Sequence, residues 1–83
     1  MGYNIKYKTS VTKDLKKLSR QESAKILDKI EAQLTKNPIS FPLLKGEFKN
    51  LRKLRIGNYL VIFTIDGNDV QVLKVGHRKN VYK

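Results

Sequence analysis

Apolar and polar residues alternate near the start of the chain and then change to a helical spacing. The segment Tyr3–Lys8 alternates aromatic or β-branched residues with polar ones, which predicts a half-buried strand. Val11, Leu15 and Leu18 then recur at the spacing of one helix face. They predict a short helix over Val11–Leu18, with its lysines on the outer side.

A second helix is predicted to begin at Ser19, because Ser19 and Glu22 have the spacing of a capping box. Its apolar stripe is formed by Ala24, Leu27, Ile30 and Leu34 and is widened by Ile26. Pro38 disfavours a helical conformation at Asn37, so the helix is expected to end before that residue. We expect both helices to serve only as scaffold.

The segment Asn37–Asn50 contains both prolines of the chain and one glycine, and we interpret it as a loop. Its apolar residues are expected to pack against the helix–sheet layer; they are Ile39, Phe41, Leu43 and Leu44. Two tight-turn sequences, Gly57-Asn58 and Asp66-Gly67-Asn68-Asp69, separate the apolar runs that follow. We therefore predict three strands, over Leu51–Ile56, Tyr59–Asp66 and Asp69–Gly76.

The predicted order of elements is β-α-α-β-β-β, and no repeat or internal linker divides residues 1–83. This order predicts a single α+β domain of two layers, in which a helical pair packs on one face of a mainly antiparallel four-stranded sheet. A chain of 83 residues is near the lower end of the size range for a domain that folds alone.

Strand alternation assigns the two faces of the C-terminal strands. The residues predicted to face the core are Leu54, Ile56, Val61, Phe63, Ile65, Leu73 and Val75. The opposite, helix-free face then carries four cations around an outward set of Leu60, Ile62 and Thr64; the cations are Lys53, Arg55, Lys74 and Arg78. Arg52 falls on the core side by parity, so we expect it at a strand edge.

The charge of the chain narrows the class of partner. Eighteen Lys and Arg residues face seven Asp and Glu residues, which gives a formal net charge of +11. Such an excess favours polyanionic partners: nucleic acid, an anionic membrane or an acidic protein. The chain has no cysteine, no apolar run near the ~20 residues of a membrane span and no signal-type segment. We therefore expect a soluble cytoplasmic protein that does not act at a membrane.

The cations of the helix-free face are candidates for binding and cleaving a phosphodiester. Like charges on neighbouring strands repel, so their presence favours phosphate binding over a structural role, although a solvated edge is the alternative. Further candidate phosphate or RNA contacts are Arg52, Lys74, His77 and Lys49. Tyr82 offers a ring that can stack on an unpaired base or pack on the sheet. With one histidine and scattered acids, we expect neither a metal nor a cofactor.

Two segments resemble the signature strands of the RelE/ParE toxin superfamily, most closely its RelE branch. They are LRKLRIGNYLVIFTI and VLKVGHRKNVY, close to the family forms L-R-x-L-R-I-G-D-Y-R-V-I-Y and V-x-x-V-G-H-R-x-x-V-Y. The resemblance covers almost the whole chain. It implies a type II toxin neutralised by an antitoxin, which we expect to be acidic, and an endoribonuclease that cuts mRNA in the ribosomal A site.

The resemblance also implies a mechanism and residue roles. The mRNA 2′-hydroxyl attacks the adjacent phosphate without a metal and gives a 2′,3′-cyclic phosphate and a 5′-hydroxyl. Lys53 matches a lysine that contributes general-base character, and Arg78 matches the arginine that stabilises the scissile phosphate. Arg55 matches an arginine that contacts phosphate or rRNA, and Tyr82 matches the tyrosine that stacks on the mRNA base.

Two positions depart from the family pattern. Leu60 stands where the family usually has a transition-state-stabilising arginine, and Leu51 stands where some members have lysine. The chain ends soon after Tyr82, so the C-terminal helix of some relatives is expected to be missing. These departures leave two alternatives: a ParE-like toxin that poisons DNA gyrase without cutting RNA, or a weakened toxin that acts mainly in a regulatory complex with its antitoxin.

Overall fold

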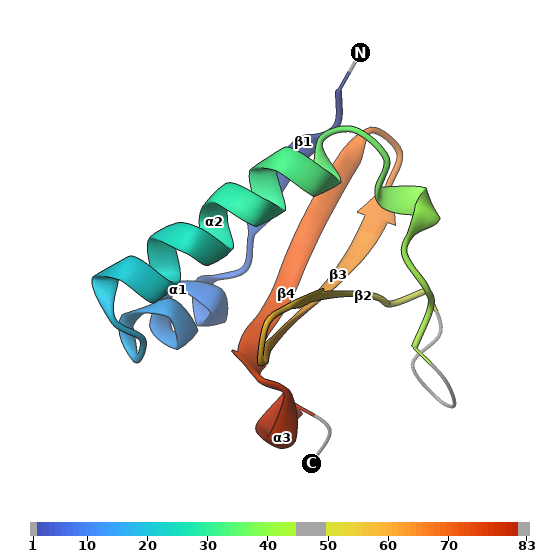
Figure 1. The fold of residues 1–83 in the computed structure, drawn as a ribbon. Coiled ribbons are helices and arrows are strands. Elements are labelled where there is room, and N and C mark those ends of the chain that lie inside the picture. The colour runs from blue at the N-terminus through green and yellow to red at the C-terminus, as the bar shows by residue number, and fades with distance from the viewer. Residues whose placement is uncertain (1, 45–49, 82–83) are drawn as a thin grey trace.

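The computed structural model describes residues 2–44 and 50–81 of the 83-residue chain (Figure 1). The elements lie in the predicted order, followed by one further helical turn. They are β1 (Asn4–Tyr7), α1 (Thr9–Lys16), α2 (Arg20–Leu34), the 3₁₀ turn η1 (Pro38–Ser40), β2 (Arg52–Ile56), β3 (Tyr59–Asp66), β4 (Asp69–His77) and α3 (Arg78–Val81). The short α3 follows β4 directly, in a segment to which the sequence pattern assigned no element.

The four strands form one mixed sheet in the order β1-β4-β3-β2. β1 runs parallel to β4, whereas the β2–β3 and β3–β4 pairs are antiparallel. Residues of α1 and α2 share one buried cluster with the sheet, so both helices pack on the same face (Figure 1). The predicted two-layer α+β fold with a mainly antiparallel sheet is confirmed.

The start of α2 follows from its cap. Ser19 has extended backbone angles, and its hydroxyl accepts a hydrogen bond from the Glu22 backbone N–H at 3.1 Å. This bond satisfies one of the amides that a helix start leaves unpaired. The buried stripe of α2 consists of Ile26, Ile30 and Leu34. The buried face of the helix is therefore rotated slightly from the predicted one, because Ala24 is exposed and Leu27 is only half-buried.

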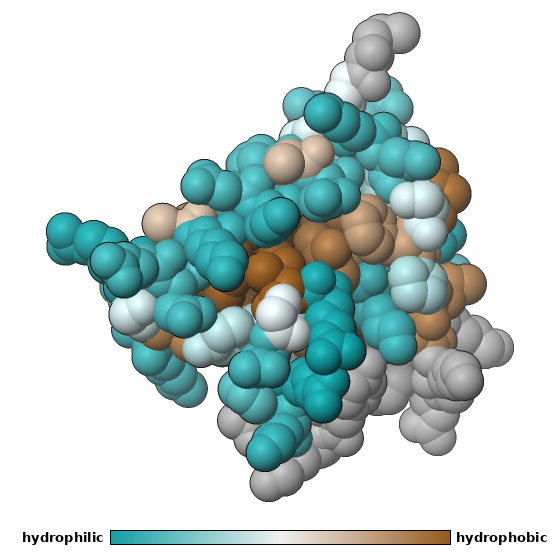
Figure 2. All heavy atoms as spheres, in the orientation of Figure 1, coloured by the Kyte–Doolittle hydropathy of each residue, from teal (hydrophilic) through white to brown (hydrophobic). Residues whose placement is uncertain are grey.

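The core lies between the two helices and the sheet, with the fully buried Phe63 on β3 as its largest side chain. Figure 2 shows hydrophobic residues between α2 and the sheet, and hydrophilic residues over the outside of α2. In β4 the core residues are Val70, Val72 and Val75. The prediction that Leu73 faces the core is wrong, because a β-bulge changes the alternation there: Ile62 pairs with Lys74 but Phe63 pairs with Val72.

Leu60 and Ile62 lie outside the core cluster, as predicted, yet they are only 3% and 5% exposed. Ile62 pairs with Lys53 on one side and Lys74 on the other. Long lysine stems cover apolar neighbours of this kind. The helix-free face therefore has an apolar floor beneath its cations.

The segment after η1 runs along the outer edge of β2. Leu43 forms an isolated antiparallel bridge with Arg52, and the Lys53 N–H donates to the Pro42 carbonyl at 3.1 Å. Phe41 packs edge-on against Phe63, with ring centroids 6.1 Å apart. The expected packing is thus confirmed for Phe41 but wrong for Ile39 and Leu43, which are 56% and 51% exposed. No helix in the described part of the chain is long and apolar enough to cross a membrane.

Candidate nucleic-acid interface

Lys53 and Arg55 project from the same face of β2, because the intervening Leu54 is buried against the core. Lys53 is half-buried and Arg55 is exposed. The strand ends at a tight turn in which Gly57 has φ +59°, a conformation that favours glycine. Arg55 Nε donates to the Gly57 carbonyl at 3.1 Å, so the turn also orients the guanidinium.

Arg78 reaches the same place from the other end of the β-meander. It begins α3 directly after β4, and its backbone N–H donates to the Asn58 carbonyl at 2.9 Å. The Gly57–Asn58 turn therefore anchors both arginines, one through its side chain and the other through its main chain. The Arg78 side chain is exposed.

The three cations line one groove of about 390 Å³ beside β2. Its floor and remaining wall are apolar; the described residues that line it are Phe41, Pro42, Lys53, Leu54, Arg55, Leu60 and Arg78. No described lining residue is acidic. A groove of this composition suits a ligand that combines phosphate groups with flat apolar surface.

Lys74 extends the cationic face beyond the groove. It is exposed and lies across Ile62 from Lys53. Two strand spacings place the backbones of the two lysines about 10 Å apart. Lys74 is not among the described lining residues, so the predicted set of four cations divides into three in the groove and one beside it.

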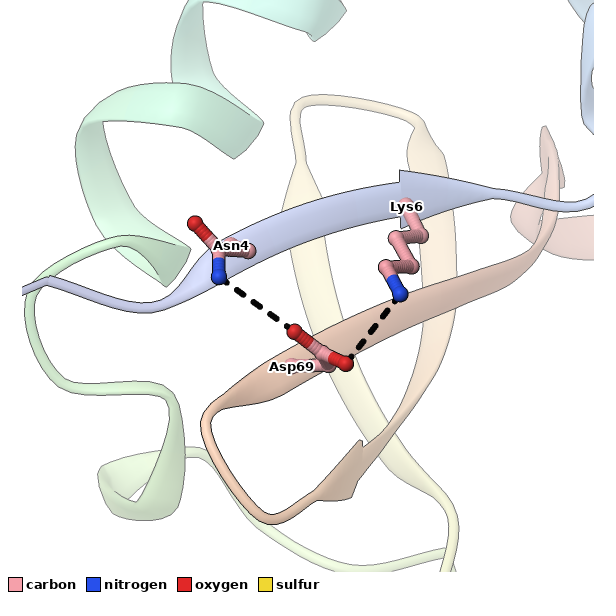
Figure 3. Close-up of polar contacts among 3 residues, drawn as sticks. All are labelled: Asn4, Lys6 and Asp69. Carbon is pink, nitrogen blue, oxygen red and sulfur yellow. Dashed lines mark hydrogen bonds and ion pairs between the residues drawn. The ribbon is translucent and has the colours of Figure 1, made fainter.

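The acidic groups that neutralise cations lie elsewhere. Among residues 2–44 and 50–81, one ion pair forms, from Lys6 Nζ to Asp69 Oδ2 at 3.2 Å. It joins the neighbouring strands β1 and β4, where Asn4 also donates to Asp69 at 3.4 Å (Figure 3). Within the same ranges, no three His, Cys, Asp or Glu side chains lie close enough to hold a metal ion.

Arg52 and His77, two predicted RNA contacts, lie outside this groove. Arg52 Nη1 donates to the carbonyls of Ile39 at 3.0 Å and Phe41 at 2.7 Å. His77 pairs in register with Tyr59, their rings meet edge to face at 5.8 Å, and its Nδ1 accepts from the Lys79 N–H at 3.3 Å. Both side chains are therefore engaged with the protein itself.

The family model described as "ParE toxin of type II toxin-antitoxin system, parDE" matches residues 5–82. The chain belongs to the RelE/ParE toxin superfamily. The toxin is also similar to solved structures of such systems. The RelBE2 toxin–antitoxin complex of Mycobacterium tuberculosis shares 26% identity at a TM-score of 0.86, over 94% of this chain and 100% of that chain.

The archaeal RelE–RelB complex of Pyrococcus horikoshii OT3 shares 25% identity at a TM-score of 0.74, over 96% and 99% of the two chains. A chromosomal ParDE system of P. aeruginosa shares the fold, with 12% identity and a TM-score of 0.76 over 90% and 95%. No protein of curated function matches the toxin in sequence. Both branches of the superfamily thus share this fold.

Of the two positions at which the sequence resemblance predicts a departure from the family pattern, Leu60 is among the described residues that line the groove and Leu51 is not. Leu60 lies at the base of the groove, whereas Leu51 is half-buried and its carbonyl accepts from the Leu44 N–H at 2.8 Å. Tyr82 and Lys49 lie outside the described residues, so their predicted roles stay predictions.

Sequence reasoning missed the groove wall formed by Phe41 and Pro42. Neither residue belongs to a periodic segment, and only the contact with β2 brings them to the cations. The two prolines and the loop composition predict a loop, but they do not indicate that it lies next to the cations.

Proposed function

We propose that this toxin is a cytoplasmic, ribosome-dependent endoribonuclease that cuts mRNA in the A site. The observation that supports it most is the convergence of Lys53, Arg55 and Arg78 on one groove without an acidic lining residue among those described. These are three of the positions to which the family resemblance assigns roles. A substrate that carries phosphate and unpaired bases fits both the cations and the apolar floor.

The groove offers the groups that this reaction needs. Lys53, in its neutral form, takes the proton of the RNA 2′-hydroxyl as the oxygen attacks the neighbouring phosphorus. Arg55 and Arg78 stabilise the negative charge that develops on the phosphoryl oxygens. The bond from phosphorus to the 5′-oxygen then breaks, and that oxygen takes a proton from water or from the ammonium formed on Lys53. The products are a 2′,3′-cyclic phosphate and a 5′-hydroxyl, and no protein residue requires a metal for these steps.

Tyr82 would hold the mRNA base beside the scissile phosphate, with Lys74 as an outer phosphate contact. We also propose an antitoxin partner, because the M. tuberculosis and P. horikoshii structures are complexes of this kind. An acidic antitoxin segment would neutralise the exposed cations of the toxin. The ribosome and mRNA are the remaining partners of the proposal.

Primer extension on a defined mRNA in a purified translation system tests the proposed activity. The wild type should produce cuts at codon-defined positions, and Arg78→Ala should lower their rate by about 10²–10³-fold, as loss of a charge-stabilising donor does. Lys79→Ala is the matched control, since Lys79 is an exposed neighbouring cation that does not line the groove. Cuts that persist unchanged in Arg78→Ala would contradict the assignment.

Gyrase poisoning is the second candidate. The matching family model is that of ParE, and Leu60 removes a charge that the nuclease branch usually has in the groove. A ParE-like toxin would cut no RNA and would instead stabilise DNA breaks made by gyrase. The same preparation, incubated with gyrase and supercoiled plasmid, therefore distinguishes the two functions.

A further inference from the structure

Arg52 holds an irregular segment of the chain in place. Its Nη1 nitrogen donates to two carbonyls, that of Ile39 in η1 and that of Phe41 immediately after it. The carbonyl at position 41 belongs to no helix or strand, so a side-chain donor gives it a partner that irregular backbone lacks. Arg52 is half-buried, and it faces the core side of β2 opposite Phe63.

The held segment is the apolar wall of the groove. Phe41 and Pro42 line it on the side where β2 forms the edge of the sheet. The Pro42 carbonyl accepts from the Lys53 N–H, and the Phe41 carbonyl accepts from Arg52. Two neighbouring residues of β2 thus fix the same wall, and Lys53 lines the groove together with it.

We propose that Arg52 is a positioning residue: it fixes the Phe41–Pro42 wall at the distance from Lys53 at which a nucleobase of the bound RNA can lie between them. This inference rests on the proposed RNA-cleaving function and assigns the wall to base contact. An aromatic ring and a proline ring offer the flat apolar surface on which unpaired bases stack. The cations opposite are left to contact the phosphates.

If Arg52 positions the wall, replacing it should change the salt dependence of RNA binding differently from replacing a cation that contacts phosphate directly. A cation that binds single-stranded nucleic acid phosphate contributes about 0.7 to the slope of log affinity against log salt concentration. Lys74→Ala, which removes the proposed outer phosphate contact, should therefore lower that slope, whereas Arg52→Ala should leave it unchanged and weaken binding at every salt concentration. Arg52→Lys keeps one donor group in place and should recover part of the loss.

The experiment measures mRNA cleavage in the purified translation system as a function of toxin concentration and salt. Arg52→Ala should raise the half-saturating concentration about tenfold, the effect of losing roughly one charge-assisted hydrogen bond, with a smaller fall in the plateau rate. Phe41→Ala should act similarly. The double variant should be little worse than Phe41→Ala alone, because residues that act through one contact are not additive.

The position of the Phe41 ring can also be measured by NMR, independently of cleavage activity. The nuclear Overhauser contact between the Phe41 and Phe63 rings should be lost in Arg52→Ala, while contacts between core methyl groups remain. The Arg52→Lys variant guards against global unfolding, because its melting temperature should stay close to that of the wild type.

Three results would overturn the positioning role: a salt slope that falls in Arg52→Ala as it does in Lys74→Ala, additive rate effects in the double variant, or intact Phe41–Phe63 contacts in Arg52→Ala. A wild type that cuts no RNA removes the proposed function together with this inference. If the wild type cuts RNA and Arg52→Ala has the same half-saturating concentration as the wild type, the positioning role of Arg52 is wrong while the proposed function stands.

Discussion

Leu60 lines the groove at the position where the sequence resemblance predicts an arginine. It pairs with Arg55 on one side and Gly76 on the other, and it is 3% exposed. Because Gly76 has no side chain, the space beside Leu60 towards β4 is bounded by backbone. A longer side chain at this position can keep its apolar stem on the floor and place its polar end in solvent or against substrate.

Replacing Leu60 by Arg should therefore increase RNA cleavage and decrease stability. A restored charge-stabilising donor is worth up to about 10²-fold in rate, whereas overfilling a packed floor lowers the free energy of unfolding by about 1–3 kcal/mol. Primer extension gives the rate, and urea denaturation gives the stability. Leu60→Met is the control of similar volume without charge. An unchanged rate would mean that Lys53, Arg55 and Arg78 already complete the site.

Tyr7 contributes a pH-dependent term to stability through its hydroxyl. Burial raises the pKa of Tyr7 from 10.0 to about 12, helped by the negative charge of Glu31 and by the hydrogen bond to it at 3.4 Å. The folded state therefore holds this proton more tightly than the unfolded chain. The stabilisation is complete below pH 10 and is lost as pH rises towards the folded pKa of about 12.

Tyr7→Phe should remove this dependence. Urea denaturation between neutral pH and pH 12 should show a steeper alkaline loss of stability in the wild type than in the variant. Tyrosinate absorbance, taken as the difference between the two proteins, should report the raised pKa directly. Parallel stability profiles in the two proteins would contradict the assignment.

At the level of elements, turn chemistry made the strands predictable. Gly57 and Gly67 both have positive φ, so each tight turn had to fall at a glycine, and the predicted bounds of β3 agree with the structure. Arg52–Ile56 and Asp69–His77 differ from prediction by one residue at one end. The convergence of Lys53, Arg55 and Arg78 followed from these turns together with strand alternation.

The bulge in β4 was not predictable from the pattern, because a strand with Val70, Val72, Leu73 and Val75 offers apolar residues in either parity. Tertiary contact decides between them. Asp14 on α1 accepts a hydrogen bond from the Val75 N–H at 3.3 Å, beside the bulge. The groove wall likewise escaped prediction, since Phe41 and Pro42 reach it only through Arg52 and the edge of β2.

Asp14→Ala should destabilise the fold because it leaves the partly buried Val75 amide without its acceptor. Loss of such a partner lowers the free energy of unfolding by about 1–3 kcal/mol, measurable by urea denaturation. Asp14→Asn keeps an acceptor oxygen and should lose less. Equal losses in the two variants would indicate that the charge of Asp14, rather than its hydrogen bond, stabilises the bulge.

For the whole molecule, the net charge of +11 opposes folding and favours binding at the same time. The ion pair between Lys6 and Asp69 joins β1 and β4 at one edge of the sheet (Figure 3), whereas the groove lies at the β2 edge and includes three cations. The helices add further exposed lysines, among them Lys25 and Lys29, four positions apart on α2. Like charges at this spacing repel.

Salt should therefore act on stability and on RNA binding in opposite directions. Raising ionic strength from about 0.01 M to 0.1 M shortens the screening length from about 30 Å to about 10 Å. The melting temperature should rise as self-repulsion is screened, while binding of a short single-stranded RNA should weaken.

The double variant Lys25→Gln/Lys29→Gln should melt at a higher temperature than the wild type in low salt, and this difference should vanish in high salt. Its RNA salt slope should match that of the wild type, because neither lysine lines the groove. A wild-type melting temperature that falls on adding salt would show that the cations are stabilised by attractive partners, and the charge excess would then need no polyanion to explain it.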